Sequence, residues 1–101
     1  MMTPYYAVIF TNTQTDKLEG YSEMAAAMEE LASQQPGYLG MEHAREDVGI
    51  TISYWETLED IKNWKSNLDH LQAQARGKEQ WYSWYKTRIC KVEREYEFHK
   101  S

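Results

Sequence analysis

Residues 38–55 read YLGMEHAREDVGITISYW, and this stretch decides the fold. Its first eight residues place Leu39, Met41 and His43 on one face of a strand, because alternate side chains of a strand point the same way. Its last six residues are rich in β-branched and aromatic side chains, which favour a second strand. A short polar link that contains Gly49 joins the two segments, so we predict an antiparallel hairpin.

Helical periodicity flanks this hairpin on both sides. Before it, apolar residues recur at steps of three and four from Leu18, with Asp16 as the expected cap. The Pro-Gly pair at residues 36–37 stops that helix. After the hairpin, residues 57–60 read Thr-Leu-Glu-Asp, which is a capping box that opens a second helix.

Two outer strands complete the pattern. Residues 5–11 are β-branched and aromatic, and residues 87–98 alternate between two faces. Residues 1–101 are therefore expected to form a single α+β domain with a ferredoxin-like βαββαβ order and a four-stranded antiparallel sheet. Because helices on one face leave the other face of the sheet bare, we expect a homodimer in which two sheets pack together.

The composition argues against several classes of protein. The 101 residues carry a net charge of −5 and present no basic face, so no nucleic-acid partner is expected. Cys90 is the single cysteine, and the histidines lie in separate elements, so neither a disulfide nor a metal site is expected. Without a leader or an apolar run of about 18 residues, we expect no membrane partner and a cytoplasmic location.

All four tryptophans lie between Trp55 and Trp84, and this concentration predicts an aromatic-walled cavity. His70 follows Trp64 by six residues. In an unbroken helix these two positions would lie about 120° apart around the axis. They can share a cavity only if the chain bends between them.

Residues 66–69, Ser-Asn-Leu-Asp, predict such a bend, because they combine a helix-ending Asn with a second capping box. A new helix over residues 68–75, closed by Gly77, would then hold His70 in its first turn. The positive end of the helix dipole favours a neutral imidazole there, which can accept a proton or bind a substrate oxygen. The alternative is a His70 that packs at a helix start and satisfies a backbone group.

Other residues are candidates for the same cavity. The run Trp-Tyr-Ser-Trp-Tyr at residues 81–85 fits a helical turn, and its rings form either a lid over the cavity or a part of the core. His43 is a second histidine that could face a ligand. Arg45 and Arg88 could hold a carboxylate or a phenolate, or form ion pairs on the surfaces of their strands.

Several motifs in order carry a resemblance to a known family. They are residues 35–40 (Gln-Pro-Gly-Tyr-Leu-Gly) after the first helix, residues 54–57 (Tyr-Trp-Glu-Thr) at the second strand-to-helix turn, and Trp64-Lys65 followed by His70. With the element order, they resemble the antibiotic biosynthesis monooxygenase domain family of small dimeric α+β-barrel proteins. The resemblance covers nearly the whole chain.

The resemblance implies a cofactor-independent monooxygenase that acts on a small phenolic or enolic aromatic compound. Such members of the family have a Trp on the second helix and a polar ring residue six positions later, which match the expected catalytic residues Trp64 and His70. The substrate would lose a proton and itself reduce dioxygen, with no flavin or metal cofactor and with His70 as base or oxyanion partner. The expected substrate-binding residues are Tyr54, Trp55, Trp81, Tyr82, His43 and Asn12.

Two alternatives stay open. A non-catalytic binding or stress-response module would use the same cavity as a sensor or carrier. The haem-degrading members of the resembled family place an iron-binding His ten positions after the Trp, where this chain has Gln74, and an Asn on the first strand, for which Asn12 is the counterpart. Haem binding is therefore the less favoured alternative.

Overall fold

The computed structural model describes residues 2–75 and 78–100, leaving aside the side chains of residues 70–75, 78 and 79. The ferredoxin-like βαββαβ order is confirmed, with one short helix added before the last strand. The strands are β1 (Tyr5–Gln14), β2 (Tyr38–Arg45), β3 (Val48–Trp55) and β4 (Tyr82–Val92), and the helices are α1 (Tyr21–Ser33), α2 (Leu58–Ala75) and α3 (Lys78–Trp81).

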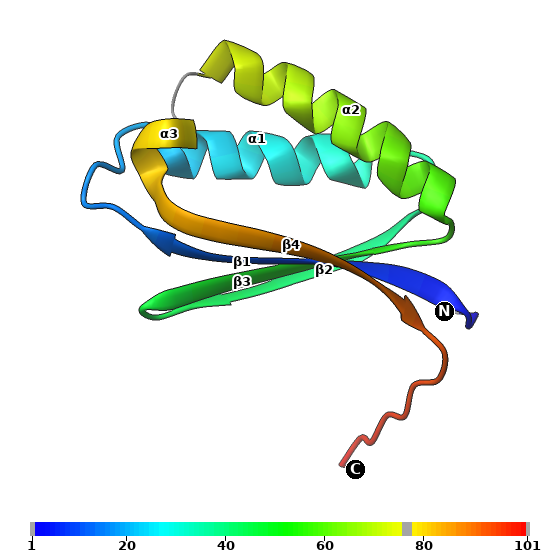
Figure 1. Cartoon of the computed structure of the whole chain (residues 1–101). Coiled ribbons are helices and arrows are strands. Elements are labelled where there is room, and N and C mark those ends of the chain that lie inside the picture. Colours follow the sequence, from blue (N-terminus) through cyan, green and yellow to red (C-terminus); the bar gives the residue numbers. More distant parts are fainter. Residues whose placement is uncertain (1, 76–77, 101) are drawn as a thin grey trace.

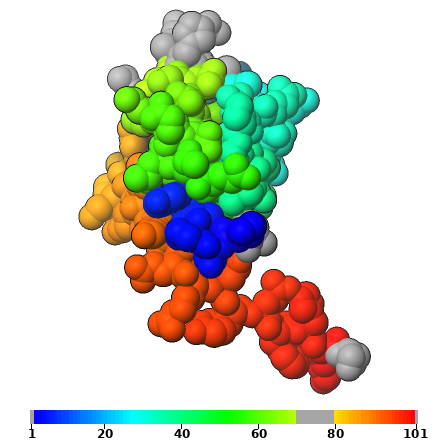
Figure 2. Space-filling model, turned by 90° about the vertical axis from the view of Figure 1, so that its right-hand side faces the viewer, coloured from blue at the N-terminus to red at the C-terminus, as the bar shows by residue number. Residues whose placement is uncertain are grey.

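The four strands form one antiparallel sheet in the order β2-β3-β1-β4. The predicted hairpin is confirmed, since β2 pairs with β3 and Arg45 lies opposite Gly49 beside the turn. Both long helices cover the same face of the sheet, and no described helix covers the other face (Figure 1). Beyond Val92 the chain leaves the sheet, and the C-terminal segment projects from the rest of the domain (Figures 1 and 2).

Trp55 is the centre of the core between the sheet and α2. Its side chain is fully buried, and its ring stacks on that of Trp64 from α2 with the centroids 5.9 Å apart. Tyr38 packs edge-on against Trp55 at a centroid distance of 5.6 Å. The Trp55 Nε1–H donates a hydrogen bond of 2.9 Å to Oγ of Ser53, so the buried indole keeps a polar partner.

Helix α2 runs without interruption through residues 66–69, so the predicted helix break is wrong. Ser66 Oγ donates a hydrogen bond of 3.3 Å to the carbonyl of Lys62, and Asn67 Nδ2 donates one of 3.0 Å to the carbonyl of Asn63. These side chains bond back to the preceding turn of the helix instead of capping a new one. Positions 64 and 70 therefore stay about 120° apart around the helix axis.

The start of α1 also differs from the prediction. The helix begins at Tyr21, and its N-cap is Gly20 with a φ of 81°, so Asp16 does not cap it. Glycine adopts this left-handed conformation without steric strain, which lets the chain turn into the helix four residues later than expected. The helix end predicted at Gly77 falls outside the described residues. No helix within residues 2–75 and 78–100 is long and apolar enough to cross a membrane.

Strand β4 begins and ends earlier than the sequence pattern indicates. The helical turn predicted over residues 81–85 is limited to Trp81, because Tyr82 already pairs with β1. At its other end β4 stops at Val92, which lies opposite Tyr5 at the start of β1. Residues 93–98 continue the alternating pattern, but β1 offers them no further partner, so the predicted extension to residue 98 is wrong.

The cap predicted at Thr57 is confirmed and sets the start of α2. Thr57 Oγ1 accepts a hydrogen bond of 3.0 Å from the backbone N–H of Asp60 and lies 2.7 Å from its carboxylate. The capped N–H belongs to the first turn, where helical donors have no partner within the helix. This cap fixes where α2 leaves the sheet.

We predict that Thr57→Ala lowers the free energy of unfolding by about 1 kcal/mol, because the N–H of Asp60 loses its acceptor. Urea denaturation followed by far-UV circular dichroism measures the change. Thr57→Ser retains the hydroxyl and should stay close to the unmutated protein. Equal stability of Thr57→Ala and the unmutated protein would contradict the capping role.

Candidate functional site

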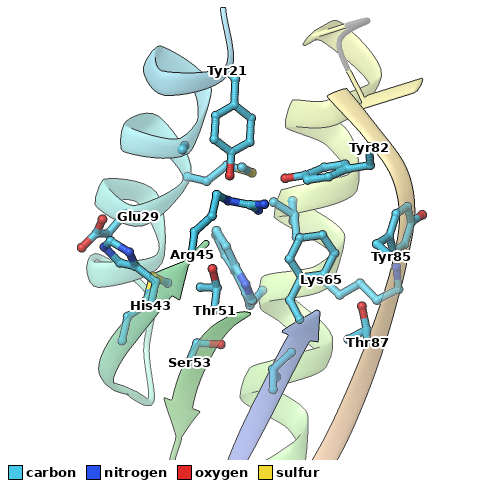
Figure 3. Close-up of a pocket in the computed structure, with 17 residues that line it drawn as sticks. Tyr21, Glu29, His43, Arg45, Thr51, Ser53, Lys65, Tyr82, Tyr85 and Thr87 are labelled. Carbon is cyan, nitrogen blue, oxygen red and sulfur yellow. The ribbon is translucent and has the colours of Figure 1, made fainter. Parts of the chain in front are cut away.

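A cavity of about 430 Å³ lies between the sheet and the two long helices (Figure 3). All four strands contribute to its floor, and α1 and α2 form its roof. The floor residues are Val8, Phe10, Met41, His43, Arg45, Thr51, Ser53, Tyr82, Tyr85 and Thr87, and the roof residues are Tyr21, Ala25, Met28, Glu29, Trp64, Lys65 and Leu68.

The strand register arranges the floor in rows that run across the sheet. One row runs from Arg45 on β2 through Gly49 and Asn12 to Tyr85 on β4. The next row, closer to the core, consists of His43, Thr51, Phe10 and Thr87. The cavity is therefore polar toward the β2–β3 turn and more apolar toward Trp64.

A bulge in β4 lets both Tyr82 and Tyr85 line the cavity. Residues three apart on a regular strand point to opposite faces of the sheet. Here the register between β1 and β4 shifts by one residue at Ser83, which restores the same orientation for both tyrosines. Each of the two rings packs on Phe10 at a centroid distance of 5.4 Å.

Arg45 reaches across the hairpin to the central strand. Its guanidinium donates a hydrogen bond to Oδ1 of Asn12, a side chain that is only 1% exposed. The Arg45 side chain passes over Gly49, where a Cβ atom would collide with the guanidinium. Within the side chains that the structure describes, no carboxylate forms an ion pair with Arg45.

The hydroxyl groups of Tyr21 and Tyr82 meet beside this guanidinium. Their two rings are edge-on, with the centroids 6.1 Å apart. Burial raises the pKa of Tyr82 above its ordinary value, Tyr21 raises it further, and Arg45 acts in the opposite direction. Figure 3 shows the guanidinium of Arg45 pointing toward both hydroxyls, and a phenol hydroxyl can donate a hydrogen bond.

The match to a family model covers the elements that build most of this cavity. The model of the antibiotic biosynthesis monooxygenase domain matches residues 4–76, which include β1, α1, β2, β3 and α2. The chain belongs to the antibiotic biosynthesis monooxygenase family. The resemblance inferred from the sequence is thereby confirmed.

The relatives of this antibiotic biosynthesis monooxygenase family member include a similar sequence and several solved structures. The chain is 43% identical over 94 residues to the uncharacterized protein YqjZ of Bacillus subtilis, a match that covers 91% of this chain and 82% of YqjZ. SnoaB, a cofactor-independent oxygenase from Streptomyces nogalater, superposes with a TM-score of 0.70 at 10% identity and with coverage of 97% and 100%. PA3566 from Pseudomonas aeruginosa gives a TM-score of 0.71 at 18% identity and coverage of 95% and 99%. At these identities the two structures show a shared fold alone.

Several residues that the sequence predicted for the site of this family member are brought together. Trp64, His43 and Tyr82 line the cavity. Asn12 lies at its polar end, where it holds Arg45 in place. The side chain of His70 lies outside the described residues, and the helix break that would have turned it toward Trp64 does not exist.

Three predicted substrate-binding residues lie elsewhere. Trp55 is buried in the core and has no contact with the cavity space. Tyr54 follows Ser53 on β3 and so points to the opposite face of the sheet, where it packs edge-on against Tyr5. Trp81 is buried, and its Nε1–H donates a hydrogen bond of 3.0 Å to the carbonyl of Glu19, so it anchors the chain before β4 instead of forming a lid.

Tyr21 was not among the predicted site residues, and the sequence did not distinguish the surroundings of Arg45 from those of Arg88. Tyr21 belongs to the apolar stripe of α1 that also supplies Ala25 and Met28, so helical periodicity contained a signal for its side. Because side chains alternate along a strand, Arg45 lies on the same face of β2 as His43, and both line the cavity. Arg88 pairs with Ile9 on the other face of the sheet.

Among the described residues, no three His, Cys, Asp or Glu side chains are placed to hold a metal ion.

The raised pKa of Tyr82 predicts a loss of stability at alkaline pH. When a tyrosine has a higher pKa in the folded chain than in the unfolded chain, its contribution is complete below about pH 10. As the pH rises through the folded pKa that contribution is lost, because the unfolded chain releases its proton first.

We therefore expect the free energy of unfolding to fall as the pH rises above about 10, and Tyr82→Phe to reduce this fall. Urea denaturation at a series of pH values measures the slope. Tyr96→Phe is the matched control, because Tyr96 is 86% exposed in the C-terminal segment. A slope in Tyr82→Phe as steep as that of the unmutated protein would show that Tyr82 ionises normally.

Proposed function

We propose that this protein is a cofactor-independent monooxygenase that oxidises a small phenolic or enolic aromatic compound with dioxygen in the cavity. The observation that carries the proposal is the convergence of an imidazole, His43, with the aromatic walls Trp64 and Phe10 on one cavity. Membership of the antibiotic biosynthesis monooxygenase family and the fold shared with SnoaB, itself a cofactor-independent oxygenase, support it.

The size and walls of the cavity suit a flat ligand. Its volume of about 430 Å³ lies within the range of about 300–1,000 Å³ that is usual for small-molecule sites. Phe10, Met41 and Leu68 offer apolar contacts along its length, and Trp64 offers an indole face. The polar groups lie mainly at the opposite end, beside Arg45, so a ligand with one oxygen-bearing end would bind in a single orientation.

The chemistry begins with removal of a proton from the substrate. The resulting anion is electron-rich, so it can transfer one electron to dioxygen, and the two radicals then combine to form a carbon–oxygen bond. When the reacting carbon carries two hydrogens, loss of water from the hydroperoxide leaves a carbonyl group. One oxygen atom stays on that carbon and the other leaves as water, and the substrate supplies all four electrons that dioxygen accepts.

His43 is the imidazole that the described structure offers for the proton transfer. It lies in the cavity floor opposite Thr51, one row from Arg45. A neutral imidazole can accept the proton. The guanidinium of Arg45, in the neighbouring row, would stabilise the negative charge that develops on the substrate. The uninterrupted helix removes the geometric reason for assigning this role to His70.

We expect the purified protein to consume oxygen with an anthrone or hydroquinone substrate, and His43→Ala to lower the rate at least about 100-fold, the usual scale for loss of a general base. An oxygen electrode measures the rate, with buffer alone and heat-denatured protein as controls for spontaneous oxidation. His70→Ala is the comparison variant. Full turnover in His43→Ala with loss in His70→Ala would return the base role to His70.

The same assay separates the alternatives. A tight aromatic ligand that binds without oxygen uptake would support a carrier or sensor and would reject the oxygenase. Titration with haemin tests the haem alternative, because a bound haem shifts the Soret band.

We also propose that two copies of the chain pack through the bare face of the sheet. Large apolar side chains on this face remain open to solvent: Val48 is 46% exposed, Ile50 40% and Trp84 47%. The register places all three on the face opposite the cavity. Contact between two such faces would bury this apolar surface, which a single chain leaves in water.

Ile50→Glu should shift the protein from dimer to monomer, because two copies would then bury an unpaired carboxylate. Size-exclusion chromatography with light scattering measures the mass across a concentration series. Leu58→Glu is the matched control, since Leu58 is 55% exposed at the start of α2, in the helical layer. A monomeric unmutated protein would reject the dimer, and an Ile50→Glu dimer would reject this face as the interface.

A further inference from the structure

The polar end of the cavity is built around a guanidinium that has spare donors. Arg45 carries five N–H donors, and Asn12 accepts one hydrogen bond from them. The other charged groups of the cavity do not neutralise it: Lys65 is also cationic and lies 3.2 Å from Asp69, and Glu29 forms no ion pair with Arg45. In the view of Figure 3, Glu29 lies on the side of Arg45 away from Tyr82. The guanidinium thus faces the cavity with its charge available.

Two neighbours determine where this charge lies. Gly49 has no side chain, and the Arg45 side chain occupies the space that a Cβ atom would take. Asn12 then receives the guanidinium at the centre of the sheet, and its own side chain is almost fully buried. An arginine at the edge of a hairpin would otherwise extend into solvent, where an ion contact is worth little. Here the register of three strands directs it over the floor of the cavity.

The paired tyrosines complete the polar end. Tyr21 and Tyr82 each carry a hydroxyl that can donate one hydrogen bond, and their rings are edge-on with centroids 6.1 Å apart. Figure 3 shows both hydroxyls on the side of the Arg45 guanidinium, so they are placed to donate toward the space in front of it. A cation and a neutral hydroxyl donor that converge on one point form a site for an oxyanion.

We propose that Arg45, with the Tyr21–Tyr82 pair, binds an oxyanion carried directly by the flat aromatic ligand, either a carboxylate or a phenolate. This inference rests on the proposed function, because it takes the cavity as the substrate site and names the substrate class. The aromatic ring lies over Phe10 toward Trp64, and the anionic oxygen points to Arg45. For a phenol or enol, the same contact stabilises the anion from which oxidation begins.

Binding of two ligands of equal shape tests the anion preference. We expect 2-naphthoate to bind the full-length protein at least about tenfold more tightly than the neutral 2-naphthamide, measured by calorimetry, since charge-assisted hydrogen bonds are the strong ones. Arg45→Gln should abolish this ratio. Gly49→Ala, which displaces the guanidinium, should reduce it. Arg94→Gln makes the same change of charge in the C-terminal segment, outside the cavity lining, and should leave the ratio intact.

A second probe separates the two sources of the oxyanion. A hydroxycoumarin absorbs at different wavelengths as phenol and as phenolate, so its ionisation can be followed while it is bound. If the site takes phenolates, the bound dye ionises at lower pH than the free dye, and Arg45→Gln removes the shift. A preference for naphthoate without this shift assigns the site to carboxylates.

The outcomes distinguish this inference from the proposed function. Equal binding of naphthoate and naphthamide, or a preference that persists in Arg45→Gln, would overturn the oxyanion site and leave the cavity as a neutral aromatic site. An Arg45-dependent preference in a protein that consumes no oxygen would support the oxyanion site and reject the oxygenase. Failure of every ligand to bind would reject both. Near-UV circular dichroism of each variant establishes that its core is intact before binding is compared.

Discussion

The stacking of Trp64 on the buried ring of Trp55 is the contact on which the rest of the molecule depends. It joins the end of β3 to the first turns of α2, and burial of each large side chain contributes about 1.5–3 kcal/mol. Because the stack fills the space between helix and sheet at one end only, the two layers remain separated beyond it. The cavity lies in that separation, and Trp64 serves both the core and the cavity wall.

The chemical character of the cavity follows from strand register more than from any motif. Gly49, which would be unremarkable in an isolated hairpin, lies between Arg45 and Asn12 and leaves room for the guanidinium. The bulge at Ser83 turns Tyr82 to the same side as Tyr85. In both places one small residue, Gly49 or Ser83, allows a large polar side chain, Arg45 or Tyr82, to face the cavity. Together these two side chains make one end of the aromatic cavity polar.

The hairpin, the cap at Thr57 and the order of the elements could be predicted because each depends on residues close in sequence. Alternation placed His43 on the correct face of its strand. The concentration of tryptophans was a poorer guide, because Trp64 lines the cavity whereas Trp55 and Trp81 are buried and Trp84 lies on the other face of the sheet. Predictions from short stretches of sequence were wrong where the same residues suit two different local structures. Ser66 and Asn67 can cap a helix or bond back to its preceding turn, and continued packing of α2 on the sheet favours the second. The aromatic run at residues 81–85 suits a helix or a strand, and pairing with β1 decides for the strand.

By itself the sequence determined the family and the βαββαβ order, since patterns of polarity and spacing along the chain carry that information. Only the tertiary structure decided which aromatic residues line the cavity. Trp55 was drawn into the core, Tyr54 lies on the far face, and Tyr21 entered the site from a helix with no distinguishing motif. It also distinguished Arg45 from Arg88. The physical reason is that a side chain's surroundings depend on register and on contacts between distant segments, and these exist only when the sheet and the helices have packed.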